Sequence, residues 1–229
     1  LLEAGDHARN LYDHLASIDS YRQVIEALDR VHEPQKAARV LMKLGLAYHT
    51  ALNFEAAHAA FNEAFSLYQR SPQQDTSTSL PTAPHPLRVV YCEKLPFSID
   101  PAHMAINSDA TLGAQMYSGL VRITPQLDVV PDMAERWAVL DKGHRYRFYL
   151  RRDAQWSDGA PLTAGDFSFA WKRALHPHHG SPLAFLLYDI RNARAYHEGA
   201  LTDPDTVGVH AIDDFTLEVE LETPIPYFL

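Results

Sequence analysis

The sequence predicts an α+β fold, in which a helical segment precedes a mixed segment of strands and helices. Apolar side chains recur at helical spacing through residues 1–70. Residues 71–86, SPQQDTSTSLPTAPHP, are rich in Pro, Ser and Thr, which is typical of a flexible linker. Residues 87–229 contain short β-forming runs and a helix that begins with a good capping sequence. We therefore divide the chain into 1–70, 71–86 and 87–229.

Residues 1–70 are expected to form helical hairpins. Asn53 can cap the helix that follows it. Gly45 and Phe61 belong to a set of residues that resembles the tetratricopeptide repeat. In that repeat a small residue lets two helices approach, and an aromatic side chain fills the groove between them. A weaker copy, containing Gly5 and Tyr21, lies forty residues earlier. The alternative is a plain helical bundle. The better-matching set is Leu44, Gly45, Tyr48, Ala57, Phe61 and Ala64.

The third segment is predicted to mix short strands with helices. Two hairpins are expected, with turns at 141–143 and at Asp213-Asp214. One helical turn is expected at 132–137. The other strands are expected at 87–91, 120–123 and 127–130, and helices at 109–117, 164–175 and 188–198.

Charges alternate with apolar residues on the two long strands of these hairpins. On the strand over 144–151, Arg145, Arg147 and Arg151 share one face. The strand after Asp214 is expected to bury Leu217 and its alternate neighbours and to expose Glu218, Glu220 and Glu222. Opposite charges on facing strands predict ion pairs. The alternative is two solvated faces that never meet.

The stretch from Trp156 to Phe167 predicts a strand exit, a tight turn and a helix start. Asp158-Gly159 is a turn pair, because glycine adopts positive φ without strain. Thr163 is a good N-cap, and Asp166 can complete a capping box. We expect the Trp156 ring to pack in the core beside this corner.

The run WSDGAPLTAGDFSFAWKRAL, residues 156–175, resembles the most recognisable segment of the family 5 extracellular solute-binding proteins. The resemblance extends over 87–229 and implies the opening part of a two-lobed fold like that of periplasmic binding proteins. Further pieces match in the same order: 98–101 (SIDP), 117–120 (YSGL), 131–137 (PDMAERW), 146–151 (YRFYLR), 211–217 (AIDDFTL) and 224–228 (PIPYF).

The resemblance implies non-catalytic binding of peptides or similar small solutes outside the cytoplasm, for delivery to the permease of an ABC transporter. It places the segment after the first strand at the ligand cleft, which here gives Glu93, Lys94, Leu95 and Phe97. Tyr188, with the apolar residues before it, is a candidate pocket wall, and core packing is the alternative. The repeats add a possible protein partner. A second hypothesis is a cytoplasmic signalling or regulatory protein that uses the solute-binding domain as its sensor.

Composition limits the other function classes. A net charge of −9 without a basic run argues against a nucleic-acid partner. The sequence has no G-x-S-x-G, H-E-x-x-H or P-loop motif, so we expect neither catalysis nor a cofactor. The patch His176-Pro177-His178-His179 reads as a helix-terminating loop rather than a metal site. The chain starts without Met inside a helical pattern and stops inside an apolar run, so we expect it to be part of a longer protein.

Overall fold

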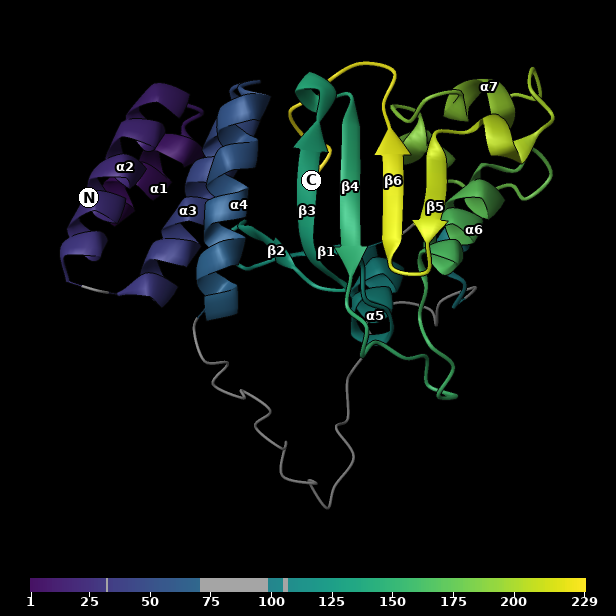
Figure 1. Ribbon diagram of the computed structural model, residues 1–229. Helices are drawn as coiled ribbons and strands as arrows, with labels where there is room; N and C mark the ends of the chain where they lie inside the picture. Colours follow the sequence, from purple (N-terminus) through teal and green to yellow (C-terminus); the bar gives the residue numbers. More distant parts are fainter. Residues whose placement is uncertain (32, 71–98, 105–106) are drawn as a thin grey trace.

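The computed structural model describes residues 1–31, 33–70, 99–104 and 107–229. A layer of four helices lies beside a four-stranded antiparallel sheet, and two further helices lie at the far side of that sheet (Figure 1). The linker predicted at 71–86 and the strand at 87–91 lie outside the described residues. In the described ranges, no helix has the length and apolarity that crossing a membrane requires. The helices are α1 (Leu2–Asn10), α2 (His14–Arg30), α3 (Pro34–Thr50), α4 (Phe54–Arg70), α5 (Asn107–Met116), α6 (Ala164–Leu175) and α7 (Ala193–His197); the strands are β1 (Val121–Ile123), β2 (Val129–Pro131), β3 (Ala134–Leu140), β4 (Arg145–Leu150), β5 (Val209–Asp213) and β6 (Thr216–Glu220).

The first four helices pack through two matching glycine–aromatic contacts. A Cβ atom on Gly45 of α3 would lie 2.5 Å from the Phe61 ring of α4, and one on Gly5 would lie 2.7 Å from Tyr21 of α2. Only a residue without a side chain permits this approach. Asn53 Oδ1 accepts a hydrogen bond from the Ala56 amide at 3.2 Å, which confirms the predicted cap. Repeat ancestry stays a prediction.

The sheet has the strand order β3-β4-β6-β5, and α4 lies along its β3 edge (Figure 1). The Trp137 ring of β3 makes edge contacts with Phe61 and Phe65 of α4, at centroid distances of 5.3 and 5.1 Å. The Val139 amide donates to His58 Nδ1 at 3.2 Å. An edge strand with unpaired amides invites further strand pairing, so α4 protects this edge.

The helical turn predicted at 132–137 is wrong, because β3 already begins at Ala134. This strand pairs with β4, with Trp137 opposite Phe148. Trp137 is almost fully buried. Long-range pairing and burial of a large ring outweigh the local helical tendency of the sequence.

The ion pairs predicted between β4 and β6 are confirmed at Glu218. This residue lies opposite Arg147, whose Nη2 is 2.6 Å from Glu218 Oε2, and Arg145 Nη1 is 3.5 Å from Oε1. The prediction that Glu218 is exposed is wrong: only 6% of the residue is accessible. Its cross-strand neighbours are Arg147 on β4 and His210 on β5. Arg151 instead pairs with Asp153.

The corner that precedes α6 has the predicted backbone. Gly159 has φ +87°, and Asp158 Oδ1 accepts a hydrogen bond from the Ala160 amide at 2.9 Å. Asp166 Oδ2 accepts from the Thr163 amide at 2.7 Å as part of a capping box. The core position predicted for Trp156 is wrong, because the ring of this residue lies at the surface and 45% of the residue is exposed.

The helix predicted at 188–198 is shorter in the structure. It consists of α7 alone, because Asn192 adopts a left-handed conformation with φ 62° directly before it. Ile190 pairs with Leu221 in an isolated bridge, which draws the preceding residues toward the sheet. The Ser168 hydroxyl of α6 donates to the Val209 carbonyl of β5 at 3.1 Å. These contacts fix α6 and α7 at the β5 side of the sheet.

Candidate functional site

Of the residues predicted to contact ligand, the structure describes Tyr188. Glu93, Lys94, Leu95 and Phe97 lie outside the described residues. Tyr188 follows a single turn of 3-10 helix, Ala184–Leu187. Its ring is half-buried, with the Arg194 guanidinium 5.0 Å from the ring centroid and the His197 ring 5.7 Å away.

Tyr188 lines a surface hollow of about 530 Å³. Charges of both signs line it: Arg194 lies among three carboxylate residues, and its Nε is 3.7 Å from Glu198 Oε1. A hollow with one aromatic wall and opposite charges suits a ligand that carries both apolar and charged groups. The other lining residues are Asp189, Arg194, Ala195, Glu198, Ala200 and Glu222.

The apolar run before Tyr188 divides between surface and interior. Phe185 and Leu186 are 58% and 63% exposed. Leu187 and Tyr188 are partly buried and pack against the core. Core packing therefore accounts for Leu187 and Tyr188, and it does not account for Phe185 and Leu186.

A second group of polar side chains lies around Asp100, near the C-terminal end of α6. Arg173 binds the Asp100 carboxylate through both Nη atoms, each at 2.7 Å. The Ala102 amide also donates to Asp100 Oδ1 at 3.0 Å. The Arg173 guanidinium holds the pKa of the Asp100 carboxyl well below its usual range. Asp100 is therefore ionised at neutral pH.

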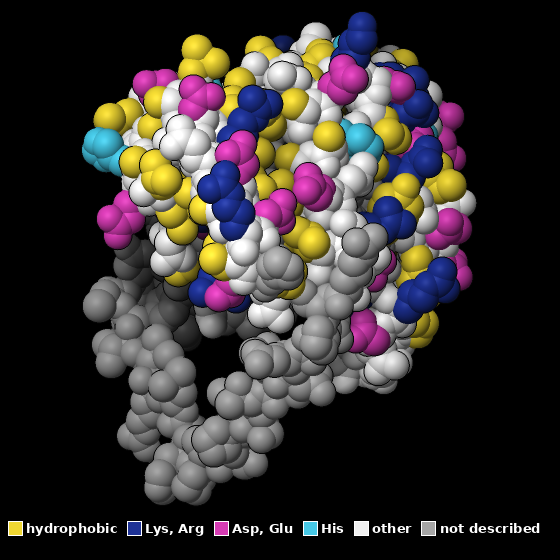
Figure 2. All heavy atoms as spheres, turned by 60° about the vertical axis from the view of Figure 1, so that its left-hand side comes forward, with side chains coloured by type: hydrophobic (Ala, Val, Ile, Leu, Met, Phe, Trp, Pro, Cys, Tyr) yellow, Lys and Arg dark blue, Asp and Glu magenta, His cyan; other side chains and the backbone are white. Residues whose placement is uncertain are grey.

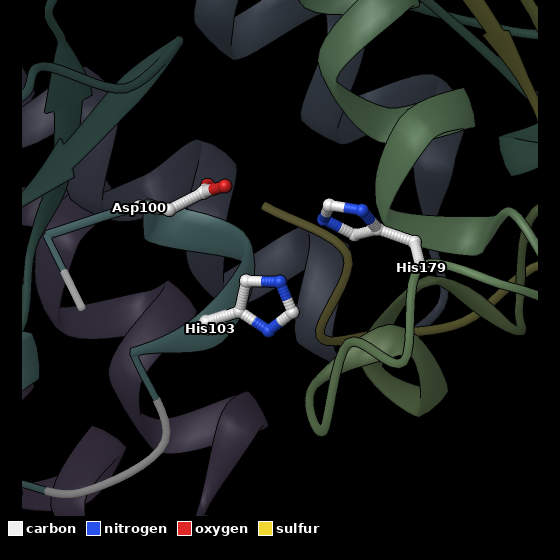
Figure 3. A group of neighbouring side chains, drawn as sticks. All are labelled: Asp100, His103 and His179. Atoms are coloured by element: carbon white, nitrogen blue, oxygen red, sulfur yellow. The ribbon is translucent and has the colours of Figure 1, made fainter. Parts of the chain in front are cut away.

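His103 and His179 lie beside this carboxylate (Figure 3). Their ring centroids are 4.6 Å apart, with an interplanar angle of 38°. One ligand atom each from Asp100, His103 and His179 lies within 4.8 Å of the others. The chemistry of this donor set, two imidazoles and a carboxylate, fits zinc and related transition metals.

Three buried side-chain nitrogens among the described residues lack a hydrogen-bond partner: Trp137 Nε1, Arg145 Nε and His179 Nε2. Burial, with Arg173 and His103 nearby, lowers the pKa of the His179 imidazole. Burial thus favours the neutral form of the ring over the protonated form.

Sequence reasoning missed this group because it weighed His176 to His179 alone. Asp100 and His103 lie more than seventy residues earlier, and no spacing rule joins them to the loop after α6. The clue present was Ser98-Ile99-Asp100-Pro101, which was read only as a piece of the family resemblance.

Comparison with known proteins finds a family match in the second part of the chain. Residues 128–229 match the family model "Bacterial extracellular solute-binding proteins, family 5 Middle". Residues 128–229 thus resemble the middle part of the family 5 solute-binding proteins. The matched residues include β2 through β6, and with them Arg173, His179 and Tyr188; Asp100 and His103 precede the match.

Individual relatives agree with this family match. We call residues 87–229 the solute-binding segment. The chain resembles the dipeptide-binding protein DppE of Bacillus subtilis, with 42% identity over 60% of this chain and 25% of the relative. It also resembles the probable deoxycholate-binding periplasmic protein YgiS of Escherichia coli, with 42% identity over 67% of this chain and 29% of the relative.

Solved structures show the same fold. Burkholderia pseudomallei OppA is 40% identical, with a TM-score of 0.55 over 57% of this chain and 26% of that one. The Escherichia coli murein tripeptide-binding protein MppA is 36% identical, with a TM-score of 0.56 over 58% and 26%. This chain therefore spans about a quarter of the length of these relatives.

Proposed function

We propose that this chain is part of a non-catalytic receptor that binds peptides or similar small solutes for an ABC importer. One observation carries the proposal: the sheet and helices of the solute-binding segment resemble those of peptide-binding receptors at 36–40% identity and TM-scores of 0.55–0.56. Since relatives of this kind include periplasmic proteins, an extracytoplasmic location follows from the same proposal.

Tyr188 is the ligand contact that we propose within the described residues. Its ring forms one wall of the hollow, and Arg194 and Glu198, which pair with each other at 3.7 Å, supply charges of both signs beside it. Glu93, Lys94, Leu95 and Phe97 remain proposed contacts at the cleft. The family closes two lobes over its ligand, so we expect binding by this chain alone to be weak.

The helical segment is proposed as a site for a protein partner. The face on which α1–α4 lie carries intermingled acidic and basic side chains (Figure 2). A nucleic-acid site would require a basic stripe. Two ion pairs join this segment to the connection between β1 and β2. Asp128 in that connection pairs with Arg9 Nη1 at 2.6 Å and with Lys43 Nζ at 3.1 Å. Helices held in this way form a rigid platform beside the solute-binding segment.

A hybrid protein tests the proposed function. Residues 128–229 would replace the matching segment of the Escherichia coli murein tripeptide-binding protein, and calorimetry would measure binding of the murein tripeptide. We expect the hybrid to bind the tripeptide. The 229-residue chain should bind it at least ~100-fold more weakly, because a ligand on this chain alone would remain exposed to solvent. A folded hybrid without peptide binding would contradict the proposal.

The same hybrid tests Tyr188. We expect Tyr188→Ala to weaken tripeptide binding, while Tyr227→Ala, at a residue that is 68% exposed, leaves it unchanged. Equal affinities of the two variants would remove Tyr188 from the ligand site and leave the family function in place.

A further inference from the structure

We propose that Asp100, His103 and His179 bind a divalent transition-metal ion, with zinc as the first ion to test. The group offers one carboxylate oxygen and two imidazole nitrogens, all within 4.8 Å of one another. Ligands at about 2.0–2.2 Å from a tetrahedral zinc ion are roughly 3–4 Å apart. Side-chain movements of about 1 Å would therefore bring the three ligands onto one ion.

The two chain segments that supply the ligands are already joined by other contacts. The buried Ser181 hydroxyl donates to the Ala102 carbonyl at 2.6 Å, and Arg173 grips Asp100. Asp100 caps the single 3-10 turn Pro101–His103 and His103 is its last residue, while His179 comes from the loop after α6 (Figure 3). The framework thus holds the ligands near one point without help from an ion.

Arg173 places a positive charge beside the proposed site, and this charge opposes the binding of a metal cation. Its bidentate pair with Asp100 offsets much of that positive charge, and a bound metal ion would share the Asp100 oxygens with Arg173 and the Ala102 amide. Carboxylates that bind metals in proteins are commonly held by a hydrogen-bonding partner of this kind. Arg173 therefore positions Asp100 rather than blocking it.

The unpartnered nitrogen of His179 points to a ligand. Burial of a polar atom without a partner is unfavourable, and buried polar groups are rarely left in this state. An ion bound between His179 and His103 satisfies this atom without water.

His179 connects the group to a surface hollow. His179 and Arg173 line this hollow, which has a volume of about 480 Å³, while Asp100 and His103 are not among its lining residues. The hollow also contains His176 and His178 of the same loop, and both are exposed. Bound metal would tie residues 99–104 to the loop after α6, and this inference is independent of peptide binding.

Metal titration of the metal-free chain tests the proposal. Calorimetry with zinc should show one ion, and cobalt should give the intense visible absorption of a site with protein nitrogen ligands. We expect His103→Ala and His179→Ala each to weaken zinc binding at least ~10-fold and to abolish the cobalt bands. His178→Ala, the same change in the same loop, should leave both signals unchanged.

The result that overturns the proposal is equally specific. Wild-type protein without stoichiometric zinc binding, or a loss in His178→Ala equal to that in His179→Ala, excludes this site. Circular dichroism checks that each variant is folded. Should His179→Ala unfold, His103→Ala decides by the same criterion.

Discussion

His49 of α3 and Tyr146 of β4 are joined by a buried hydrogen bond, with Nε2 and Oη 2.6 Å apart. His49 Nδ1 lies 3.2 Å from the Pro226 carbonyl, which can only accept a hydrogen bond. Nδ1 therefore carries the proton, and Nε2 accepts from the Tyr146 hydroxyl. This neutral imidazole connects the helical segment to the sheet.

Acid should loosen this connection. Burial lowers the pKa of His49 to about 4, against 6.5 for the unfolded chain. Between these two values the unfolded state binds more protons, so the contribution of His49 is full above pH 6.5 and is lost as pH falls toward 4. The loss is on the order of 3 kcal/mol. We expect urea denaturation to show a smaller decrease in stability over this range for His49→Gln, which forms hydrogen bonds but does not titrate.

His7→Gln provides the matched control for this pH experiment, because His7 is an exposed residue of α1. We expect its pH dependence to equal that of the wild-type chain. If His49→Gln also retains the wild-type pH dependence, the buried neutral histidine is not the group that responds to acid.

Gly45→Ala should destabilise the helical segment by about 1–3 kcal/mol, because the new methyl group would overlap the Phe61 ring. Gly165→Ala is the control, since its nearest neighbour would be Thr163 Oγ1 at an ordinary 3.4 Å. That change should be neutral or stabilising. Denaturant melts compare the two. Adding Phe61→Leu should recover part of the loss in Gly45→Ala, and no recovery would mean that the cost arises elsewhere.

Trp137 of β3 and Trp156, which precedes α6, should respond differently to truncation. Trp137 is 1% exposed and packs on α4, so Trp137→Ala should cost about 3–5 kcal/mol. Trp156 is 45% exposed, and Trp156→Ala should cost less than half of that. Thermal or urea melts give both values. Equal losses would place the Trp156 ring in a packed environment after all.

Glu218→Gln should cost about 1–3 kcal/mol, since the change removes the charge that binds Arg145 and Arg147 while the site stays buried. Glu135→Gln is the matched control on β3: Glu135 is exposed and lies 3.9 Å from Arg136. It should shift stability by less than ~0.5 kcal/mol. Urea melts at low and high salt would measure both. A Glu218 variant as stable as the control would show that the pair is effectively solvated.

The sequence by itself determined the features that depend on neighbours along the chain. The spacing of apolar residues predicted the helices of residues 1–70, and α6 begins and ends where the capping residues and periodicity placed it. Gly159 has its positive φ because the turn at Asp158-Gly159 requires it. The family resemblance rests likewise on contiguous runs of residues.

The tertiary structure alone decided the features that join distant parts of the chain. Strand pairing made β3 out of a stretch with helical tendency, and Glu218 is buried on β6 between β4 and β5. The contact of His49 with Tyr146 crosses ninety-seven positions, and the group of Asp100, His103 and His179 joins two segments. A sequence pattern records which side chains share a face of one element. Only the packing of elements against one another determines which faces meet.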